Sequence, residues 1–299
     1  MKTPKYLSKG SKIAIVSPAG YINPDFVKSA EAYLKSIGYN VEISEHCLGR
    51  FNQMASTDDE RLADLQQALD NPEINAILCS RGGYGVNHII DKIDMTKFAK
   101  KPKWILGFSD ITNLHLLANK HGVRSLHCQM AKAIHNNSEA ECIKNIFRIL
   151  EGEKISYTFE PNELNRKGTV KGELIGGNMS IIYSLQGTDF AIDCDDKILF
   201  IEDLNEYLYH LDRMMLNLKI SGKLAKLRGL VVGSFSDMKD NASPFGKTAY
   251  EIVKAHTAEY SYPIGFGIPV GHIDDNQPLV EGGQYRLEIS DTNCSLTML

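Results

Sequence analysis

The class of fold is clearest in the residues Trp104-Ile105-Leu106-Gly107-Phe108-Ser109-Asp110-Ile111. Residues 104–108 are apolar and predict a buried strand, and residues 111–119 resume helical spacing. A strand that runs directly into a helix is the repeating unit of a parallel sheet covered by helices. Such sheets bind ligands at the carboxyl ends of their strands, which is where this pattern places Ser109.

The same unit recurs towards the N-terminus. Apolar runs predict further strands at 12–17, 40–44 and 74–79, and amphipathic spacing predicts helices at 24–37 and 58–69. This alternation predicts an α/β protein whose N-terminal domain is a parallel sheet with flanking helices.

The second half of the chain has a different texture. A polar segment begins near Glu151 and continues through Asn165-Arg166-Lys167-Gly168, as in a linker between domains. Beyond it we predict strands at 197–201 and 230–234 and a helix at 209–220, followed by a Gly- and Pro-rich end. The predicted domains are therefore 1–165 and a smaller, mixed, β-rich C-terminal domain at 166–299.

Composition limits the classes of partner. Hydrophobic residues make up 43% and charged residues 23% of the chain, and the net charge of -4 is spread without long runs. These values predict a globular protein and argue against nucleic acid as a partner. Residues 1–12 are polar and contain Pro4, and no stretch has transmembrane length, so we expect neither a secretion signal nor a membrane.

Cysteine usage bears on the compartment. The six cysteines are scattered and predict reduced, mostly buried thiols: Cys47, Cys79, Cys128, Cys142, Cys194 and Cys294. Together with the polar N-terminus, this indicates the cytoplasm. Export by a route that leaves no N-terminal mark is the alternative.

Ser109 has two interpretations from its local sequence. As an exposed hydroxyl at the start of a helix, it is a candidate nucleophile, with the amide of Asp110 free to stabilise an oxyanion. As a serine at a helix start, it is also a candidate N-cap. The segment does not complete the pattern G-x-S-x-G, because Ile111 occupies the last position.

A glycine-rich turn follows the predicted strand at 74–79, with the sequence Arg81-Gly82-Gly83-Tyr84-Gly85. Its glycines let backbone amides approach a bound group closely, and a phosphate is one candidate. The spacing matches neither the dinucleotide fingerprint nor the lysine-containing phosphate loop, and an ordinary turn is the alternative.

A serine nucleophile needs a base, and the chain has nine histidines. His272 stands out because Pro269-Val270-Gly271-His272 places it in a loop, where side chains are often functional. Other histidines lack the spacing of a zinc site, so no metal is expected: His115, His121, His127 and His135. An acid that orients the imidazole is available after the strand at 197–201, but spacing does not choose among Glu202, Asp203 and Glu206.

Together these segments resemble the LD-carboxypeptidase family, which includes the microcin C immunity peptidases. In the first half the resemblance rests on residues 13–19 (IAIVSPA), 57–65 (TDDERLADL), 81–85 (RGGYG) and 107–112 (GFSDIT). In the second half it rests on residues 174–178 (LIGGN), 202–206 (EDLNE), Asp212-Arg213 and Gly271-His272. The matched segments occur in order over nearly the whole chain.

The resemblance implies a metal-independent serine carboxypeptidase that hydrolyses an LD-amide bond and needs no cofactor. It implies that Ser109 is the nucleophile, His272 the general base and Glu202 the residue that orients His272. The backbone amides of Gly83 and Asp110 would form the oxyanion hole. Because Ser109 and the other two members come from different predicted domains, the site would form across the domain interface.

The resemblance also implies a substrate, murein tetrapeptide, from which the protein would release terminal D-alanine during peptidoglycan recycling. Relatives commonly form homodimers, and Arg81 and Tyr84 are candidate substrate-binding residues. Two alternatives stay open. One is hydrolysis of a peptidyl or aminoacyl nucleotide, as in the microcin C branch, and the other is a nucleotide- or peptide-binding protein without catalysis.

Two segments depart from the family pattern. His127-Cys128-Gln129-Met130 replaces His-Gly-Pro-Met, and Pro278-Leu279-Val280-Glu281-Gly282 replaces the more typical order Leu-Pro-x-Gly. Both departures leave the implied triad intact. They bear on the choice of substrate more than on the type of reaction.

Overall fold

Two sheets organise the chain, and a computed structural model describes all 299 residues. The first unit comprises Met1–Glu153 and Gln277–Gly282, and the second comprises Lys154–Asn276 and Gly283–Leu299. The polar segment after Glu151 contains a strand, β6 (Ser156–Phe159), that pairs with β13 (Cys294–Met298) in the second sheet. The first break between the units therefore lies at Glu153, before the predicted boundary at 165.

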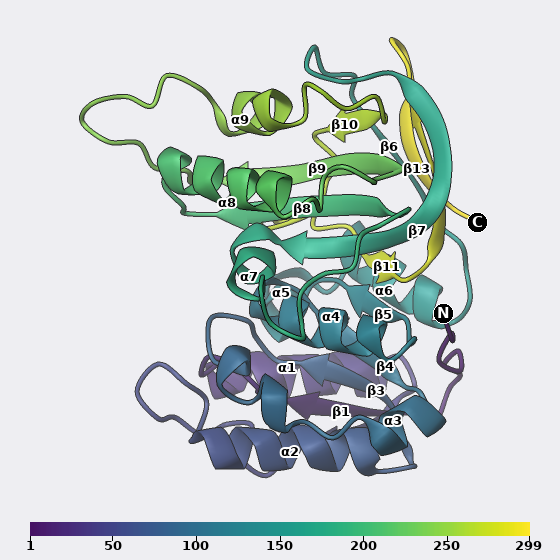
Figure 1. Ribbon diagram of the computed structural model, residues 1–299. Coiled ribbons are helices and arrows are strands. Elements are labelled where there is room, and N and C mark those ends of the chain that lie inside the picture. Colours follow the sequence, from purple (N-terminus) through teal and green to yellow (C-terminus); the bar gives the residue numbers. More distant parts are fainter. The chain divides into compact units, whose positions relative to one another are not determined.

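The first unit has a six-stranded sheet in the order β11-β5-β4-β3-β1-β2 (Figure 1). Its strands are β1 (Lys12–Val16), β2 (Asn40–Ile43), β3 (Ile74–Cys79), β4 (Trp104–Gly107), β5 (Ser125–His127) and the antiparallel β11 (Leu279–Glu281). Its α-helices are α1 (Pro24–Ser36), α2 (Asp58–Asp70), α3 (Thr96–Lys100), α4 (Thr112–Lys120), α5 (Ala131–Asn137) and α6 (Glu141–Leu150). Short 3-10 helices are η1 (Val86–His88), η2 (Ile90–Lys92) and η3 (Ser109–Ile111). The predicted parallel sheet with flanking helices is confirmed.

The strand order of this sheet reverses next to β1. β1 pairs in parallel with both β2 and β3, and β3 pairs with β4. The chain thus moves outward from β1 to β2 and then returns to the other side for β3 and β4. The carboxyl ends of the strands at such a reversal are where α/β sheets bind ligands. The loops after β1, β3 and β4 contain Gly20, Arg81 and Ser109 respectively.

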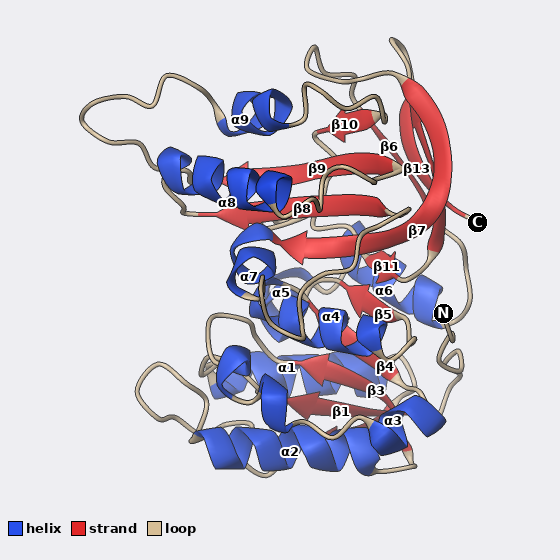
Figure 2. Cartoon of the chain, viewed as in Figure 1, coloured by secondary structure: helices blue, strands red, loops and turns tan.

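Helices cover both faces of this sheet. Right-handed crossovers place α1 on one face and α2, α3 and α4 on the other. Figure 2 shows α2 in front of the strands and α1 behind them. At the centre Trp104 is fully buried, and its Nε1 donates a hydrogen bond of 3.2 Å to the carbonyl oxygen of Lys5.

The second unit has a seven-stranded mixed sheet in the order β10-β9-β8-β7-β12-β13-β6. Besides β6 and β13, its strands are β7 (Gly168–Asn178), β8 (Ile198–Leu204), β9 (Gly229–Ser236), β10 (Ile264–Phe266) and β12 (Gln284–Ile289). Its α-helices are α7 (Met179–Ser184), α8 (Leu208–Ile220) and α9 (Ala249–His256). β7, β8, β9 and β10 are parallel, and the others pair antiparallel. The mixed, β-rich second half is therefore confirmed.

β7 joins the two parts of this sheet. Its first residues pair antiparallel with β12, and its last residues, from Leu174 to Asn178, pair in parallel with β8. At Gly176 the two strands come so close that a Cβ atom would lie 1.9 Å from the carbonyl oxygen of Phe200. This register sets Asn178 opposite Glu202, at the carboxyl end of β8.

All six cysteines are free and buried, in line with the sequence prediction. Burial raises the pKa of Cys47 to about 11, and it does the same for Cys194. These thiols are therefore protonated near neutral pH. None of the helices combines the length and the apolar character needed to cross a bilayer.

Gly176→Ala is expected to destabilise the second unit by about 3 kcal/mol, because overpacking against backbone cannot be relieved by a side-chain movement. Gly187→Ala is the control, since its position is open and only its φ of +81° opposes a side chain. Gly187→Ala should lower the free energy of unfolding by about 1 kcal/mol. Urea unfolding followed by circular dichroism measures both changes. Equal losses in the two variants would contradict the close approach at Gly176.

Candidate functional site

Ser109 begins the turn between β4 and α4 in a strained backbone conformation. Its φ is 65°, in the left-handed region that non-glycine residues rarely adopt. No side-chain hydrogen bond caps η3 or α4, whose N-cap residues are Phe108 and Ile111. The hydroxyl therefore does not serve as a helix cap. A partly exposed serine on a strained turn from strand to helix is the conformation of a nucleophile elbow.

The glycine turn lies directly against Ser109. A Cβ atom on Gly82 would come within 2.8 Å of the Ser109 Cβ and 3.0 Å of its Oγ. The next residue, Gly83, is exposed and has a φ of +105°. Gly20, from the loop after β1, donates its N–H to the carbonyl oxygen of Gly82 at 3.1 Å. The loops after β1 and β4 thus both contact the loop after β3 at Gly82.

Asp110 ties the glycine loop to the serine turn through its carboxylate. Its Oδ2 accepts a hydrogen bond of 3.0 Å from the Val86 N–H, and its Oδ1 accepts one of 3.1 Å from Asn113 Nδ2. Burial raises the pKa of Asp110 to about 6, against the opposing effects of the Val86 hydrogen bond and the Arg61 charge. The sequence interpretation used only the amide of Asp110 and missed this second role of the residue.

Arg61 is a buried cation on α2 that supports two of the same loops. Its Nη1 donates to the carbonyl oxygens of Pro18 and Gly85, and its Nη2 pairs with Asp58. The side chain is 1% exposed. Carbonyl oxygens and a carboxylate compensate such a cation, and together they fix the loops after β1 and β3. Sequence reasoning missed this role, because an arginine among acidic residues at a helix start resembles an ordinary solvated charge.

His115 holds the carboxyl end of β4 through a hydrogen bond to its main chain. Its Nε2 lies 2.9 Å from the carbonyl oxygen of Gly107, which can only accept, and its Nδ1 lies 2.8 Å from Ser125 Oγ. Burial lowers the pKa of His115 to about 4, although the hydrogen bond to Gly107 opposes that shift. His115 is thus a neutral structural residue that holds the strand leading to Ser109.

In the second unit, His272 is hydrogen bonded to a buried carboxylate. Its Nδ1 lies 2.7 Å from Oε2 of Glu202, which is fully buried at the end of β8. Burial of the ring lowers the pKa of His272, but the charge and hydrogen bond of Glu202, together with the Asp203 charge, outweigh burial, and the pKa lies above its ordinary value of 6.5. Because a carboxylate only accepts, Nδ1 carries the proton and Nε2 keeps a lone pair in the neutral ring.

A glycine lets the His272 loop reach Glu202. A Cβ atom on Gly271, whose φ is +121°, would lie 2.9 Å from both Cβ and Oε2 of Glu202. The Gly271 N–H donates to Asn276 Oδ1, and Ser236 Oγ donates to the His272 carbonyl oxygen, each at 2.9 Å. These bonds fix the main chain on both sides of the imidazole.

The three acids near the end of β8 have different partners. Asp203 accepts hydrogen bonds from Asn178 Nδ2 at 2.9 Å and Ser180 Oγ at 2.7 Å. Burial, followed by the nearby Glu202 charge, raises the pKa of Asp203 to about 6. Glu206 bonds to His210 Nδ1 at 2.6 Å. Among the three, the hydrogen bond to the His272 ring is made by Glu202, a choice that spacing left open.

The two candidate substrate-binding residues are both exposed. The Tyr84 hydroxyl lies 3.2 Å from His88 Nε2. Arg81 Nη1 donates a hydrogen bond of 2.8 Å to the carbonyl oxygen of Tyr21. In the sequence of this loop Arg81 and Tyr84 flank Gly82 and Gly83, and Gly82 lies against Ser109.

The two units offer the parts that acyl transfer needs. The first presents a serine hydroxyl on a strained turn beside the backbone of Gly82, and the second presents an imidazole whose tautomer is fixed by a buried carboxylate. Nucleophile, base, orienting acid and backbone donors are the groups by which serine hydrolases are recognised.

Comparisons with known proteins agree with this reading. A family model described as the LD-carboxypeptidase N-terminal domain matches residues 13–128, and one described as the LD-carboxypeptidase C-terminal domain matches residues 171–287. A probable murein peptide carboxypeptidase of Bacillus subtilis is 32% identical over 278 residues, which cover 90% of this chain and 86% of the relative.

Solved structures show the same fold. Muramoyltetrapeptide carboxypeptidase from Oxalobacter formigenes is 29% identical, with a TM-score of 0.88 over 96% of this chain and 98% of that one. An MccF-like protein from Bacillus anthracis is 24% identical, with a TM-score of 0.86 over 100% and 99% of the two chains. The second likeness concerns the fold alone.

The strain at Ser109 predicts an unusual order of stability. Ser109→Gly should be more stable than Ser109→Ala by about 1 kcal/mol, because glycine adopts a positive φ without the cost that alanine incurs. At Ser29, inside α1, the order should reverse by about 1 kcal/mol, since glycine weakens the interior of a helix. Urea unfolding followed by the fluorescence of Trp104, the single tryptophan, measures all four variants. The same order at both sites would argue against strain at Ser109.

Proposed function

We propose that this chain, which belongs to the LD-carboxypeptidase family of serine peptidases, releases terminal D-alanine from murein tetrapeptide by hydrolysing an LD-amide bond. One observation carries the proposal. The backbone of Ser109 has a φ of 65°, its side chain lies against Gly82, and its hydroxyl caps no helix. The relatives named for murein peptides support the choice of substrate.

In the proposed first step, Ser109 Oγ attacks the carbonyl carbon of the scissile amide. His272 Nε2 takes the hydroxyl proton as the carbon–oxygen bond forms. The carbonyl oxygen becomes an oxyanion and accepts hydrogen bonds from the Gly83 and Asp110 amides. Glu202 stabilises the imidazolium, consistent with its hydrogen bond to His272 Nδ1.

In the second step the carbon–nitrogen bond breaks, and the imidazolium gives its proton to the leaving amine, so that D-alanine departs. Water then attacks the acyl-enzyme and transfers a proton to His272, and the Ser109–carbon bond breaks as Oγ regains that proton. The products are the shortened peptide acid, D-alanine and the regenerated enzyme. No step calls for a cofactor or a metal.

The microcin C immunity reaction and a binding function without catalysis are tested as alternatives. D-alanine release from murein tetrapeptide supports the first proposal, whereas cleavage of an aminoacyl sulfamoyl adenosine alone would replace it. The predicted homodimer and cytoplasmic location stay predictions, and sedimentation and cell fractionation test them.

Ser109→Ala should lower kcat for D-alanine release by at least roughly 10³-fold, because the nucleophile is removed while binding is retained. Release of D-alanine from murein tetrapeptide is the measurement, and Trp104 fluorescence controls for folding. A serine-reactive phosphonate should label wild type and not the variant. Equal labelling of both proteins would refute the nucleophile assignment.

The pH dependence of kcat/KM should report the raised pKa of His272. The base works only when neutral, so activity should rise with pH through an acidic limb that lies above pH 6.5. Glu202→Gln removes the charge that raises this pKa, so the limb should move to lower pH while the plateau falls roughly 10³-fold.

Glu206→Gln is the matched control for that experiment, since the Glu206 carboxylate bonds to His210 rather than to His272. Its pH profile should match that of wild type. If Glu202→Gln also left the acidic limb in place, the proposed pairing would be wrong.

A further inference from the structure

We propose that Arg81, assisted by Arg50, binds the terminal carboxylate of the peptide substrate and thereby restricts the enzyme to the last amide bond. This inference rests on the proposed function, because it assigns a role in the same reaction. It specifies which part of the substrate Arg81 contacts.

The Arg81 side chain lies against the backbone of Gly20 and Gly83, in the two loops that meet at Gly82. Its Nε is 3.7 Å from the position of a Cβ on Gly20 and 4.0 Å from that of a Cβ on Gly83. Its Nη1 is anchored on the Tyr21 carbonyl oxygen at 2.8 Å. A single anchor of this kind holds the planar guanidinium in place and leaves its other N–H groups for a ligand.

A second guanidinium shares the same aromatic ring. Arg50 Cζ lies 4.1 Å and Arg81 Cζ 5.9 Å from the centroid of the Tyr21 ring. Both distances fall within the range of cation–π attraction. Tyr21 therefore gathers two exposed positive charges beside the loops that carry Gly20 and Gly83.

These charges have no anionic partner in the protein. Neither guanidinium takes part in an ion pair, whereas those of Arg61, Arg148 and Arg286 each pair with a carboxylate. Two like charges on one ring repel each other, and a bound anion would relieve that repulsion. The arrangement favours an anionic group of the substrate.

The position of the pair matches what cleavage of a terminal residue demands. In a peptide whose last amide is cut, the terminal carboxylate carbon lies only about 3 to 4 Å from the scissile carbonyl carbon. A group that recognises it must therefore adjoin the nucleophile. Arg81 immediately precedes Gly82, whose Cα would place a Cβ 2.8 Å from that of Ser109.

The test compares two substrates that differ only at the terminal carboxylate. One is murein tetrapeptide, and the other is the same peptide with a terminal D-alaninamide in place of D-alanine. Wild type should prefer the acid, and Arg81→Gln should lower kcat/KM for the acid by at least about tenfold, the value of a hydrogen bond to a charged group. The rate on the amide should change less than about twofold, so the acid-to-amide ratio collapses. Arg81→Lys keeps the charge and should recover part of the ratio. Arg50→Gln should lower the acid-to-amide ratio less than Arg81→Gln does.

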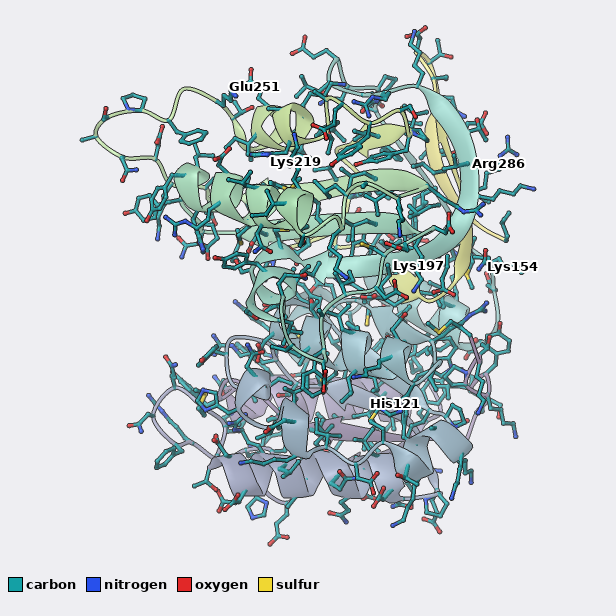
Figure 3. The ribbon with its side chains drawn as sticks, in the orientation of Figure 1. His121, Lys154, Lys197, Lys219, Glu251 and Arg286 are labelled. Atoms are coloured by element: carbon teal, nitrogen blue, oxygen red, sulfur yellow. The ribbon has the colours of Figure 1, made fainter.

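Arg286→Gln is the control, since Arg286 projects outward from β12 in the second unit (Figure 3) and pairs with Glu288. Its ratio should equal that of wild type. If Arg81→Gln lowered both rates in proportion, Arg81 would be a structural residue of the loop, and the inference would be overturned.

If the proposed function is wrong, the wild-type protein will release no D-amino acid from either peptide. That result differs from a failure of the Arg81 inference, in which wild type is active. With an inactive wild type, binding of N-acetyl-D-alanine to Ser109→Ala protein still decides the inference. Weaker binding by at least about tenfold after adding Arg81→Gln supports a carboxylate site. Unchanged binding overturns it.

Discussion

Backbone packed directly against a functional side chain is the constraint on which both halves of the candidate site depend. Gly82 lies against Ser109 in the first unit, and Gly271 lies against Glu202 in the second, each at a distance that leaves no room for a Cβ atom. These contacts let main-chain amides and an imidazole reach their partners without intervening side chains. They also make both positions intolerant of substitution, because a single methyl group at either glycine would push it away from the side chain that it contacts.

Burial of charge is the second constraint. Asp110, Asp203, Glu202 and Arg61 are each at most 1% exposed. The three carboxylates accept hydrogen bonds, and Arg61 donates hydrogen bonds to the carbonyl oxygens of two loops. Glu202 is the incomplete case, because its Oε1 has no hydrogen-bond partner while Oε2 binds His272. An under-satisfied carboxylate gains most when a positive charge forms beside it. Its environment therefore favours the imidazolium that the proposed mechanism forms at His272.

Apolar periodicity predicted the helices and strands whose formation depends on nearby residues in the sequence. The strand and helix around Ser109, and those from β1 to β3, follow from apolar periodicity, and so do β8, α8 and β9. The strand β6 was missed because it is polar and exists through its pairing with β13, which is distant in sequence. For the same reason, spacing did not select Glu202 among three acids. That choice depends on the path of the loop that carries Gly271.

The short strand β11 interrupts the second unit and belongs to the first sheet, where it pairs with β5. During synthesis the first 153 residues are made well before β11, so the edge of β5 stays unpaired until residues 279–281 have been added. His272 emerges only shortly before that strand. A nascent chain would therefore carry its serine turn early but acquire its proposed base and the last strand of its first sheet at nearly the same moment, so that the proposed nucleophile stays without its base until its own sheet can be completed.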